Sequence, residues 1–460
     1  MLRSYWPDIK TLLNLAWPVV ISRVGILTLG ITDTVMVGRY ASEQLAYLGI
    51  GMVPSNIYIL IMIGLLMGTP VLVSNRFGAQ EYDKTGQVWW NALPWGFFIG
   101  LVGMVFCFFG EEFLLLTGQT PELAEAGGRI SVIAGLSLPL AAIHMTTGFF
   151  LEGIRNPRPG MAIMIAANII NIFANYIMVY GLYGVPEMGA EGSIWATFIV
   201  RCAQVVAILS YVWFFLDHEK YGVRKPQINW AAGRDLRRIG YASGISMGLE
   251  NTAFNVLVLF AGFLGTVAVA AHVIMINVFA LFFMMGLGFG VATSVSVGNA
   301  YGAGDMEAVK RWAWLGLSVQ TVVMVVAGVL QFFTADISAA FFSEDPAVIG
   351  LAAALIAWVS IGIVFDTGQS LVSMSLRARG DTWIPTLIHF IAYGVVMIPL
   401  AYVMIFPLGR GAIGLADGVI LGTLVPFALV MLRYRALDRK AAQQSALQAT
   451  AKAEEVQATS

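Results

Sequence analysis

The stretch of sequence that decides the fold runs from residue 239 to residue 304 and reads IGYASGISMGLENTAFNVLVLFAGFLGTVAVAAHVIMINVFALFFMMGLGFGVATSVSVGNAYGAG. Glu250 carries the only formal charge among these 66 residues. A membrane-spanning helix needs about 20 predominantly apolar residues, so this stretch predicts two consecutive spans. Soluble domains rarely contain such a segment, and the sequence therefore predicts an integral membrane protein.

The composition of the whole chain agrees with this prediction. Of its 460 residues, 58% are hydrophobic and 12% are charged, whereas ordinary globular domains carry about 45–50% and about 25%. The net charge of −1 gives no reason to expect a nucleic-acid partner. Cys107 and Cys202 both fall in predicted spans, which argues against a disulfide framework.

Apolar runs between charged residues and Gly or Pro breaks predict twelve spanning helices. The spans must be helical because a bilayer offers the backbone no hydrogen-bond partners. Residues Gly265 and Thr266 separate the seventh span from the eighth. The approximate limits are residues 12–37, 46–73, 88–109, 128–153, 160–183, 190–215, 238–263, 267–297, 311–334, 347–375, 384–407 and 412–432.

The distribution of basic residues predicts the orientation in the membrane, since Lys and Arg are enriched in cytoplasmic loops. With the N-terminus inside, 21 of the 26 basic residues face the cytoplasm; Arg377 and Arg379 are among them. Three fall outside and two, Arg23 and Arg201, fall within spans. This bias predicts two cytoplasmic termini, which agrees with an even number of spans, and a location in the plasma (inner) membrane.

An internal repeat divides the chain. VSNRFGAQEYDKTGQVWW at residues 73–90 aligns without gaps to VGNAYGAGDMEAVKRWAW at residues 297–314, an offset of 224. The repeat predicts two six-helix lobes, residues 1–215 and 236–435, related by a pseudo-twofold axis along the membrane normal. Residues 216–235 would form a cytoplasmic linker and residues 436–460 a disordered cytoplasmic tail. Such a duplication could serve stability alone, but halves that rock about a central site are typical of transporters.

Three carboxylates lie deep within predicted spans: Asp33 in GITDTVMVGRY, Glu250 in SMGLENTAFN and Asp366 in GIVFDTGQS. A charge at the centre of a spanning helix costs about 2.5–3.5 kcal/mol on insertion scales, so each needs a partner or a role. Carboxylates from both lobes are suited to a cationic substrate or a coupling ion. The alternative for each is a buried structural hydrogen-bonding centre.

Two coupling ions are compatible with these acids. A carboxyl group removed from water can take up a proton on one side of the membrane and release it on the other. With neighbouring oxygen atoms it can equally hold Na⁺. The candidate oxygen donors are Asn171 and Asn175, one turn apart on the fifth span, and Thr197 on the sixth.

The remaining intramembrane features favour structural roles. Arg23 and Arg201 are interpreted as structural ion pairs or as residues that snorkel, with contact to a carboxylate or an anionic group as the alternative. Pro18 removes a backbone hydrogen bond from the first span and is a candidate hinge. Neither a catalytic constellation nor a metal-ligand spacing is evident, so we expect no enzyme activity, no cofactor and no metal beyond a possible Na⁺ at the coupling residues.

The chain resembles the multidrug and toxic compound extrusion (MATE) transporters, and in its second-half acids it is similar to their NorM branch. The resemblance covers the chain up to about residue 435. Its strength lies in the order and spacing of the matching segments, which are ITDTVMVGRY with the upstream Pro18, the GAQEYDK and GAGDMEAVK loops, NIINIFANYIMVYG, AAHVIMIN and LRARGDTWIP.

The resemblance implies a twelve-helix antiporter that exports organic, mostly cationic, compounds against an inward flow of Na⁺ or H⁺. It implies that Asp33, Asn171, Asn175 and Thr197 match the cation site of the first half, and that Glu250 and Asp366 match the ion or substrate carboxylates of the second. We expect a monomer. The alternative is a flippase for a lipid-linked oligosaccharide, whose diphosphate would require a cationic cavity.

Overall fold

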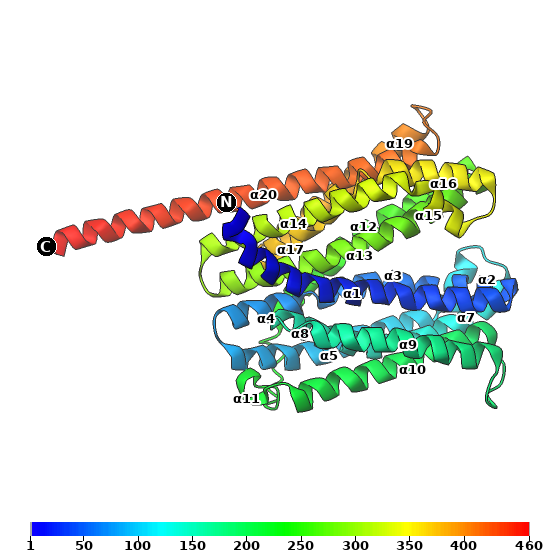
Figure 1. The fold of residues 1–460 in the computed structure, drawn as a ribbon, viewed down its shortest axis with the longest axis horizontal. Coiled ribbons are helices and arrows are strands. Elements are labelled where there is room, and N and C mark those ends of the chain that lie inside the picture. The colour runs from blue at the N-terminus through cyan, green and yellow to red at the C-terminus, as the bar shows by residue number, and fades with distance from the viewer. Residues whose placement is uncertain (1, 460) are drawn as a thin grey trace.

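The computed structural model describes residues 2–459, and every regular element within that range is a helix (Figure 1). Eleven helical segments there are long and apolar enough to cross a membrane. A twelfth span consists of α16 (Pro346–Val359) and α17 (Ile363–Ala378), which meet at a bend of 48°. The prediction of an all-helical membrane protein with twelve spans is confirmed.

The first half of the chain supplies six of these spans, several of them assembled from consecutive helices. Its elements are α1 (Leu2–Tyr40), α2 (Ser42–Gly51), α3 (Val53–Leu66), α4 (Gly68–Gly78), α5 (Tyr82–Phe108), α6 (Gly110–Leu116), α7 (Pro121–Leu136), α8 (Leu138–Gly153), α9 (Arg158–Tyr180), α10 (Gly189–Ser210) and the π-helical turn η1 (Tyr211–Phe215).

The second half follows the short helix α11 (His218–Tyr221), which lies in the predicted linker. Its other elements are α12 (Arg234–Leu264), α13 (Thr266–Gly302), α14 (Met306–Phe333), α15 (Ala335–Phe342), α18 (Trp383–His389), the π-helical segment η2 (Phe390–Met397), α19 (Ile398–Ile405) and α20 (Ile413–Thr459).

Local chemistry explains where the spans divide. Gly265 separates α12 from α13. Its backbone has a φ of 106°, a conformation that residues with a Cβ rarely adopt. The predicted tenth span differs from the structure, because it is interrupted at residues 360–362 and begins again as α17. The interruption places Asp366 in the first turn of a new helix, where unpaired backbone N–H groups favour a negative charge.

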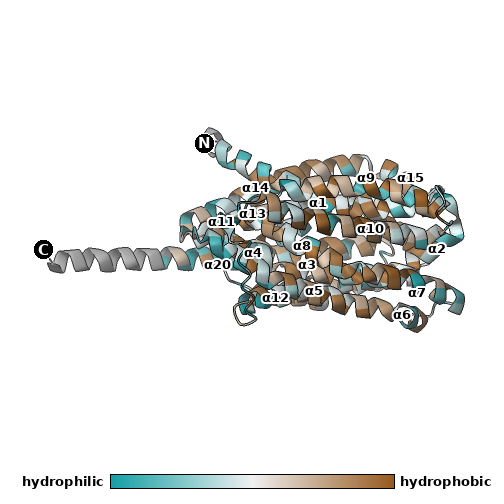
Figure 2. Ribbon diagram, turned by 90° about the horizontal axis from the view of Figure 1, so that it is seen from below, coloured by the Kyte–Doolittle hydropathy of each residue, from teal (hydrophilic) through white to brown (hydrophobic). Residues whose placement is uncertain are grey.

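Hydrophobic residues predominate along the middle of the bundle (Figure 2), as expected for a protein that crosses lipid. Large hydrophobic side chains are exposed along the spans, among them Phe98, Val206, Leu259 and Val326. A soluble monomer seldom exposes contiguous apolar surface of this extent.

The two halves pack against one another through a few helices. In Figure 1 the first half lies below the second, with α1 and α13 adjacent to one another between them. α13 also packs against α4 of the first half and α17 of its own. Both chain ends lie at the same end of the bundle, as an even number of spans requires.

The last helix extends beyond the final span, and the predicted disorder of the tail stays a prediction. Residues 436–459 continue α20 as a helix, in keeping with the many Ala, Gln, Lys and Glu residues there, which have high helix propensity. Asp438 accepts a hydrogen bond from Arg379 at 2.7 Å, so the start of this region is bound to the second half.

Candidate functional site

The first-half site is built around Asp33 on α1. Asn175 donates a hydrogen bond to one carboxylate oxygen of Asp33 at 2.8 Å, and Asn171 donates to the same oxygen at 3.3 Å. Thr197 donates to the other oxygen at 2.8 Å. All four side chains are buried. Helices α1, α9 and α10 thus bring together the four first-half residues that the sequence analysis selected.

The amides of this site have unused acceptors. Nδ2 of each asparagine faces Asp33, while Oδ1 of Asn171 and Oδ1 of Asn175 are buried without a donor among the described residues. A buried acceptor without a donor is costly and calls for a partner. Because amide and carboxylate oxygens are ligands that hard cations prefer, these oxygens and those of Asp33 can serve a bound cation.

The second-half site contains Glu250 on α12. Tyr393 of η2 donates a hydrogen bond to Oε1 of Glu250 at 3.0 Å, and Gln369 of α17 donates to the Tyr393 hydroxyl at 3.1 Å. Gln369 and Tyr393 are buried completely. Neither residue was predicted from the sequence, because a single Gln or Tyr in an apolar span does not show which helix it faces.

Asp366 lies one turn before Gln369 on α17. Its side chain is 1% exposed, and its Oδ1 has no hydrogen-bond partner in residues 2–459. Oε1 of Gln369 is likewise buried without a donor. The second half therefore resembles the first in chemistry, since each contains a buried carboxylate and at least one buried amide oxygen without a donor among residues 2–459.

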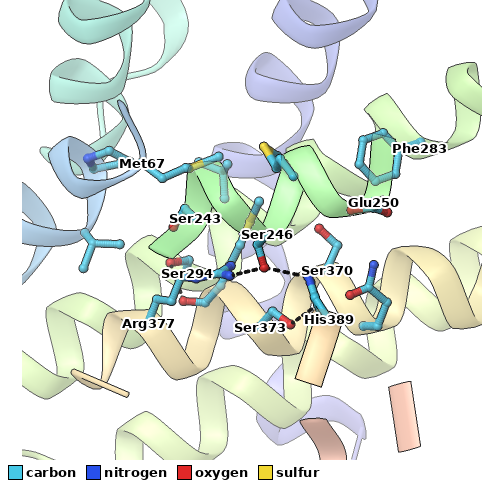
Figure 3. Close-up of a pocket in the computed structure, with 16 residues that line it drawn as sticks. Met67, Ser243, Ser246, Glu250, Phe283, Ser294, Ser370, Ser373, Arg377 and His389 are labelled. Atoms are coloured by element: carbon cyan, nitrogen blue, oxygen red, sulfur yellow. Dashed lines mark hydrogen bonds between the residues drawn. The ribbon is translucent and has the colours of Figure 1, made fainter. Parts of the chain in front are cut away.

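A narrow cleft opens beside the second-half site (Figure 3). Glu250 and Gln369 line it from the second half, and Met67 and Pro70 of the first half complete its wall. The cleft thus lies where the two halves meet, and Glu250 is the acid that faces it.

Arg23 on α1 forms a buried ion pair with Glu152 on α8. One guanidinium nitrogen lies 2.8 Å and 2.9 Å from the two carboxylate oxygens, and both side chains are less than 10% exposed. This pair agrees with the structural interpretation of Arg23. Glu152 was missed because it lies at the end of the predicted fourth span, where a charge is unremarkable.

Removing one member of this pair should destabilise the protein more than removing both. Glu152→Gln leaves the Arg23 charge buried without a counterion, and we expect a loss of about 3–5 kcal/mol in the free energy of unfolding. The double variant Arg23→Leu, Glu152→Leu should lose less, because no charge remains unpaired. The free energy of unfolding of each variant is measured by titration with sodium dodecyl sulfate, with circular dichroism as the signal. Equal losses in the single and the double variant would contradict the prediction.

The roles predicted for Arg201 and Pro18 stay predictions. Arg201 lies one turn after Thr197 on α10, and its Nε is buried without an acceptor among the described residues. Pro18 lies inside the continuous helix α1, and its role as a hinge stays a prediction.

A model of the MatE family matches residues 18–177 and again residues 242–403. The two matches begin 224 residues apart, which is the offset of the repeated loop. The chain belongs to the MATE family of membrane transporters. As predicted, it is a transporter and not an enzyme.

MATE relatives align with almost the whole chain. It is 37% identical over 444 residues to the "Probable multidrug resistance protein NorM" of Caulobacter vibrioides, an alignment that covers 95% of this chain and 94% of the relative. It is 31% identical to the "Multidrug resistance protein PmpM" of Pseudomonas aeruginosa, with 90% and 88% covered. The NorM-like resemblance is therefore confirmed.

Solved structures show the same fold. The eukaryotic MATE transporter AtDTX14 superposes with a TM-score of 0.88 at 20% identity and covers 96% of this chain and 99% of its own. A MOP superfamily transporter from Pyrococcus furiosus superposes with a TM-score of 0.85 at 18% identity, with 94% and 96% covered.

Proposed function

We propose that this MATE protein exports organic cations in exchange for Na⁺ or H⁺ that moves inward. The observation that carries the proposal is the buried Asp33 beside two amide oxygens, Oδ1 of Asn171 and Oδ1 of Asn175, that have no donor in the part of the chain that the structure describes. Acceptors in excess of donors favour a bound cation or proton. The multidrug resistance names of relatives that align over nine-tenths of the chain support an organic cargo.

In the proposed mechanism each half contributes one acidic site. Asp33 holds the coupling ion in the first half, and Asp366 and Glu250 bind the ion or the cationic cargo in the second. Occupation by the inward-moving ion neutralises the carboxylates, so the cationic cargo loses its counter-charge and leaves. The halves then rock about the sites to expose them to the opposite side.

The proposal includes the orientation of the protein in the membrane and its oligomeric state. Both termini face the cytoplasm and the chain works as a monomer in the inner membrane. The flippase alternative receives less support from the relatives, whose printed names are those of multidrug resistance proteins.

Counterflow in proteoliposomes tests the proposal. Purified protein is reconstituted with ethidium inside, and a Na⁺ gradient and a pH gradient are imposed separately at zero membrane potential. We expect one of them to accelerate ethidium movement. Transport that is indifferent to both gradients would overturn the antiport proposal.

Asp33→Asn should weaken the response to the driving gradient. The variant has no ionisable group, and its amide would bring N–H donors towards those of Asn171 and Asn175. We expect the acceleration by the effective gradient to fall about tenfold or more, as when a charged hydrogen-bonding group is lost. Asp336→Asn, the same substitution at an exposed residue of α15, is the control. An unchanged dependence on both gradients would remove Asp33 from coupling.

A further inference from the structure

The segment that joins the two halves carries an excess of positive charge. Residues 216–238 contain six Lys and Arg residues against three Asp and Glu residues. None of the six pairs with a carboxylate within 4.0 Å among residues 2–459. Five of them are exposed and one is partly buried. The six basic residues are Lys220, Arg224, Lys225, Arg234, Arg237 and Arg238.

This segment begins and ends where two spans end. The sixth span ends at Phe215 and the seventh begins at Arg234, and α11 between them lies at the end of the bundle that carries both termini (Figure 1). Trp213 and Trp230 flank the segment and are 40% and 58% exposed. Tryptophan is enriched at the boundary between membrane and water, where its ring lies at the level of the headgroups. The basic residues of the segment therefore lie near that level as well.

Each of these two tryptophans is covered by an arginine. Arg224 donates a hydrogen bond to the backbone oxygen of Trp213 at 2.8 Å, and its guanidinium carbon lies 5.4 Å from the centre of the Trp213 ring. Arg237 makes the same two contacts with Trp230, at 2.7 Å and 3.9 Å. A cation over an aromatic face is attracted by the ring. The same Arg–Trp pair therefore occurs twice and fixes the position of both guanidinium groups.

Both guanidinium groups keep N–H donors free for a further ligand. A guanidinium has five such donors. Arg237 donates through one nitrogen to Trp230, and Arg224 donates to Trp213 and has a second nitrogen 3.4 Å from Nε2 of His218. Free donors in the planar fork of an arginine suit the oxygens of a phosphate group. Each pair can therefore hold a phosphate beside an apolar ring.

Contacts with α5 bring the two pairs onto one surface. Nε1 of Trp90 donates a hydrogen bond to the backbone oxygen of Val223 at 2.7 Å. The backbone N–H of Asn229 donates to Oδ1 of Asn91, also at 2.7 Å. Each of these two linker residues directly precedes a member of one Arg–Trp pair. Because Trp90 and Asn91 are consecutive, the linker is held at both points against the same turn of α5.

Apolar side chains are exposed beside the two pairs. Phe214 and Phe215 follow Trp213 and are 70% and 77% exposed, and Ile228 precedes the second pair and is 60% exposed. Exposure of such side chains to water is unfavourable. The surface thus combines unpaired positive charge with uncovered apolar side chains, and a phospholipid offers a phosphate for the first and acyl chains for the second.

We propose that this surface binds an anionic phospholipid of the adjacent leaflet. The phosphate group binds Arg224 and Arg237, Lys225 adds positive charge next to Arg224, and the acyl chains lie along Trp213 and Trp230. Basic residues at a membrane surface attract anionic lipids, whereas a zwitterionic headgroup brings a cation of its own to a surface that is already positive. The inference goes beyond the proposed exchange and depends on neither the coupling ion nor the cargo.

Native mass spectrometry of the full-length chain in detergent tests the inference. The protein is titrated separately with phosphatidylglycerol, which is anionic, and with phosphatidylcholine, which is zwitterionic and has the same acyl chains. The dissociation constant of the first bound lipid is measured for each. We expect the wild type to bind phosphatidylglycerol about tenfold or more tightly than phosphatidylcholine.

Arg224→Gln combined with Arg237→Gln should weaken binding of phosphatidylglycerol about tenfold or more and binding of phosphatidylcholine less than about threefold. Lysine at both positions should retain part of the preference, because it keeps the charge but not the planar fork. Arg76→Gln combined with Lys84→Gln is the matched control. It also removes two positive charges, from exposed residues outside the linker, and should leave both dissociation constants unchanged.

A second variant keeps the test decisive if the glutamine double variant does not elute as a folded protein. Lys225→Gln combined with Arg234→Gln changes only exposed side chains of the linker. It should weaken binding of phosphatidylglycerol about fivefold and leave binding of phosphatidylcholine unchanged.

Four results would overturn the inference. They are a wild type without preference for phosphatidylglycerol, linker variants that weaken neither lipid, linker variants that weaken both equally, and a control variant that loses the preference as the linker variants do. Inorganic phosphate at the concentration of the lipid should not displace phosphatidylglycerol; displacement would mean that the surface binds free phosphate and no lipid. Because no transport is measured, each outcome is separate from the antiport proposal.

Discussion

Asp366→Asn should reduce gradient-driven ethidium transport to the background of empty liposomes while the protein still inserts and folds. Asp366 is buried, its Oδ1 has no donor among residues 2–459, and it lies in the first turn of α17, where the interrupted span begins again. Asparagine keeps the shape of the side chain but can neither ionise nor balance a cation. The substitution therefore removes the charge that the proposed exchange requires, at little cost in packing.

The measurement compares initial ethidium efflux rates in proteoliposomes that contain equal amounts of protein. Elution as a single peak in size-exclusion chromatography establishes that the variant is folded. Asp336→Asn at the exposed end of the bundle should transport as the wild type does, and Asp366→Glu should recover part of the activity. Efflux at the wild-type rate by Asp366→Asn would exclude Asp366 from the mechanism.

The fold was predictable because the cost of burying charge in lipid is so large. Residues 239–304 carry only one formal charge, and this scarcity of charge predicted two spans there. The structure divides the two spans at Gly265, the predicted position. The break at residues 360–362 was not predicted. The hydropathy of an apolar segment is the same whether its helix is continuous or bent. Hydropathy therefore predicts that a segment lies in lipid but does not predict a bend within it.

The sequence singled out Asp33, Asn171, Asn175 and Thr197 because they are conspicuous polar residues in apolar spans, and the structure brings the four together. The second-half site was predicted only in its acids. Sequence spacing gives the depth of a residue along its own helix but does not show which helix faces it. The contacts of Tyr393 with Glu250 and Gln369 therefore gave no signal in the sequence.

The repeated loop marks a close contact between the two halves. Gly78 at the end of α4 and Gly302 at the end of α13 are equivalent by the offset of 224. A Cβ at Gly78 would lie 1.9 Å from the carbonyl oxygen of Asn299, and a Cβ at Gly302 would lie 1.9 Å from that of Asn75, its counterpart. The two contacts are reciprocal, and they hold the halves together at the end of the bundle that carries both termini (Figure 1).

Gly78→Ala combined with Gly302→Ala should therefore open this end of the bundle. Ordinary contact would require roughly 1.5 Å of further separation at each site. Overpacking of this kind costs about 1–3 kcal/mol, which shifts an equilibrium between the packed and the open arrangement by about 5- to 150-fold. Transport should fall accordingly, because the packed arrangement becomes rare.

Spin labels on two exposed and equivalent residues, Ala79→Cys and Ala303→Cys, report the separation when Cys107 and Cys202 are replaced by serine. Pulsed electron paramagnetic resonance should reveal a population at longer distance in the double variant. Gly160→Ala on α9, where an added Cβ meets nothing within 4 Å, should leave the distances and the transport rate unchanged. A double variant with wild-type distances and wild-type transport would mean that the backbones can absorb two methyl groups without separating, and the reciprocal glycines would then not determine how closely the halves pack.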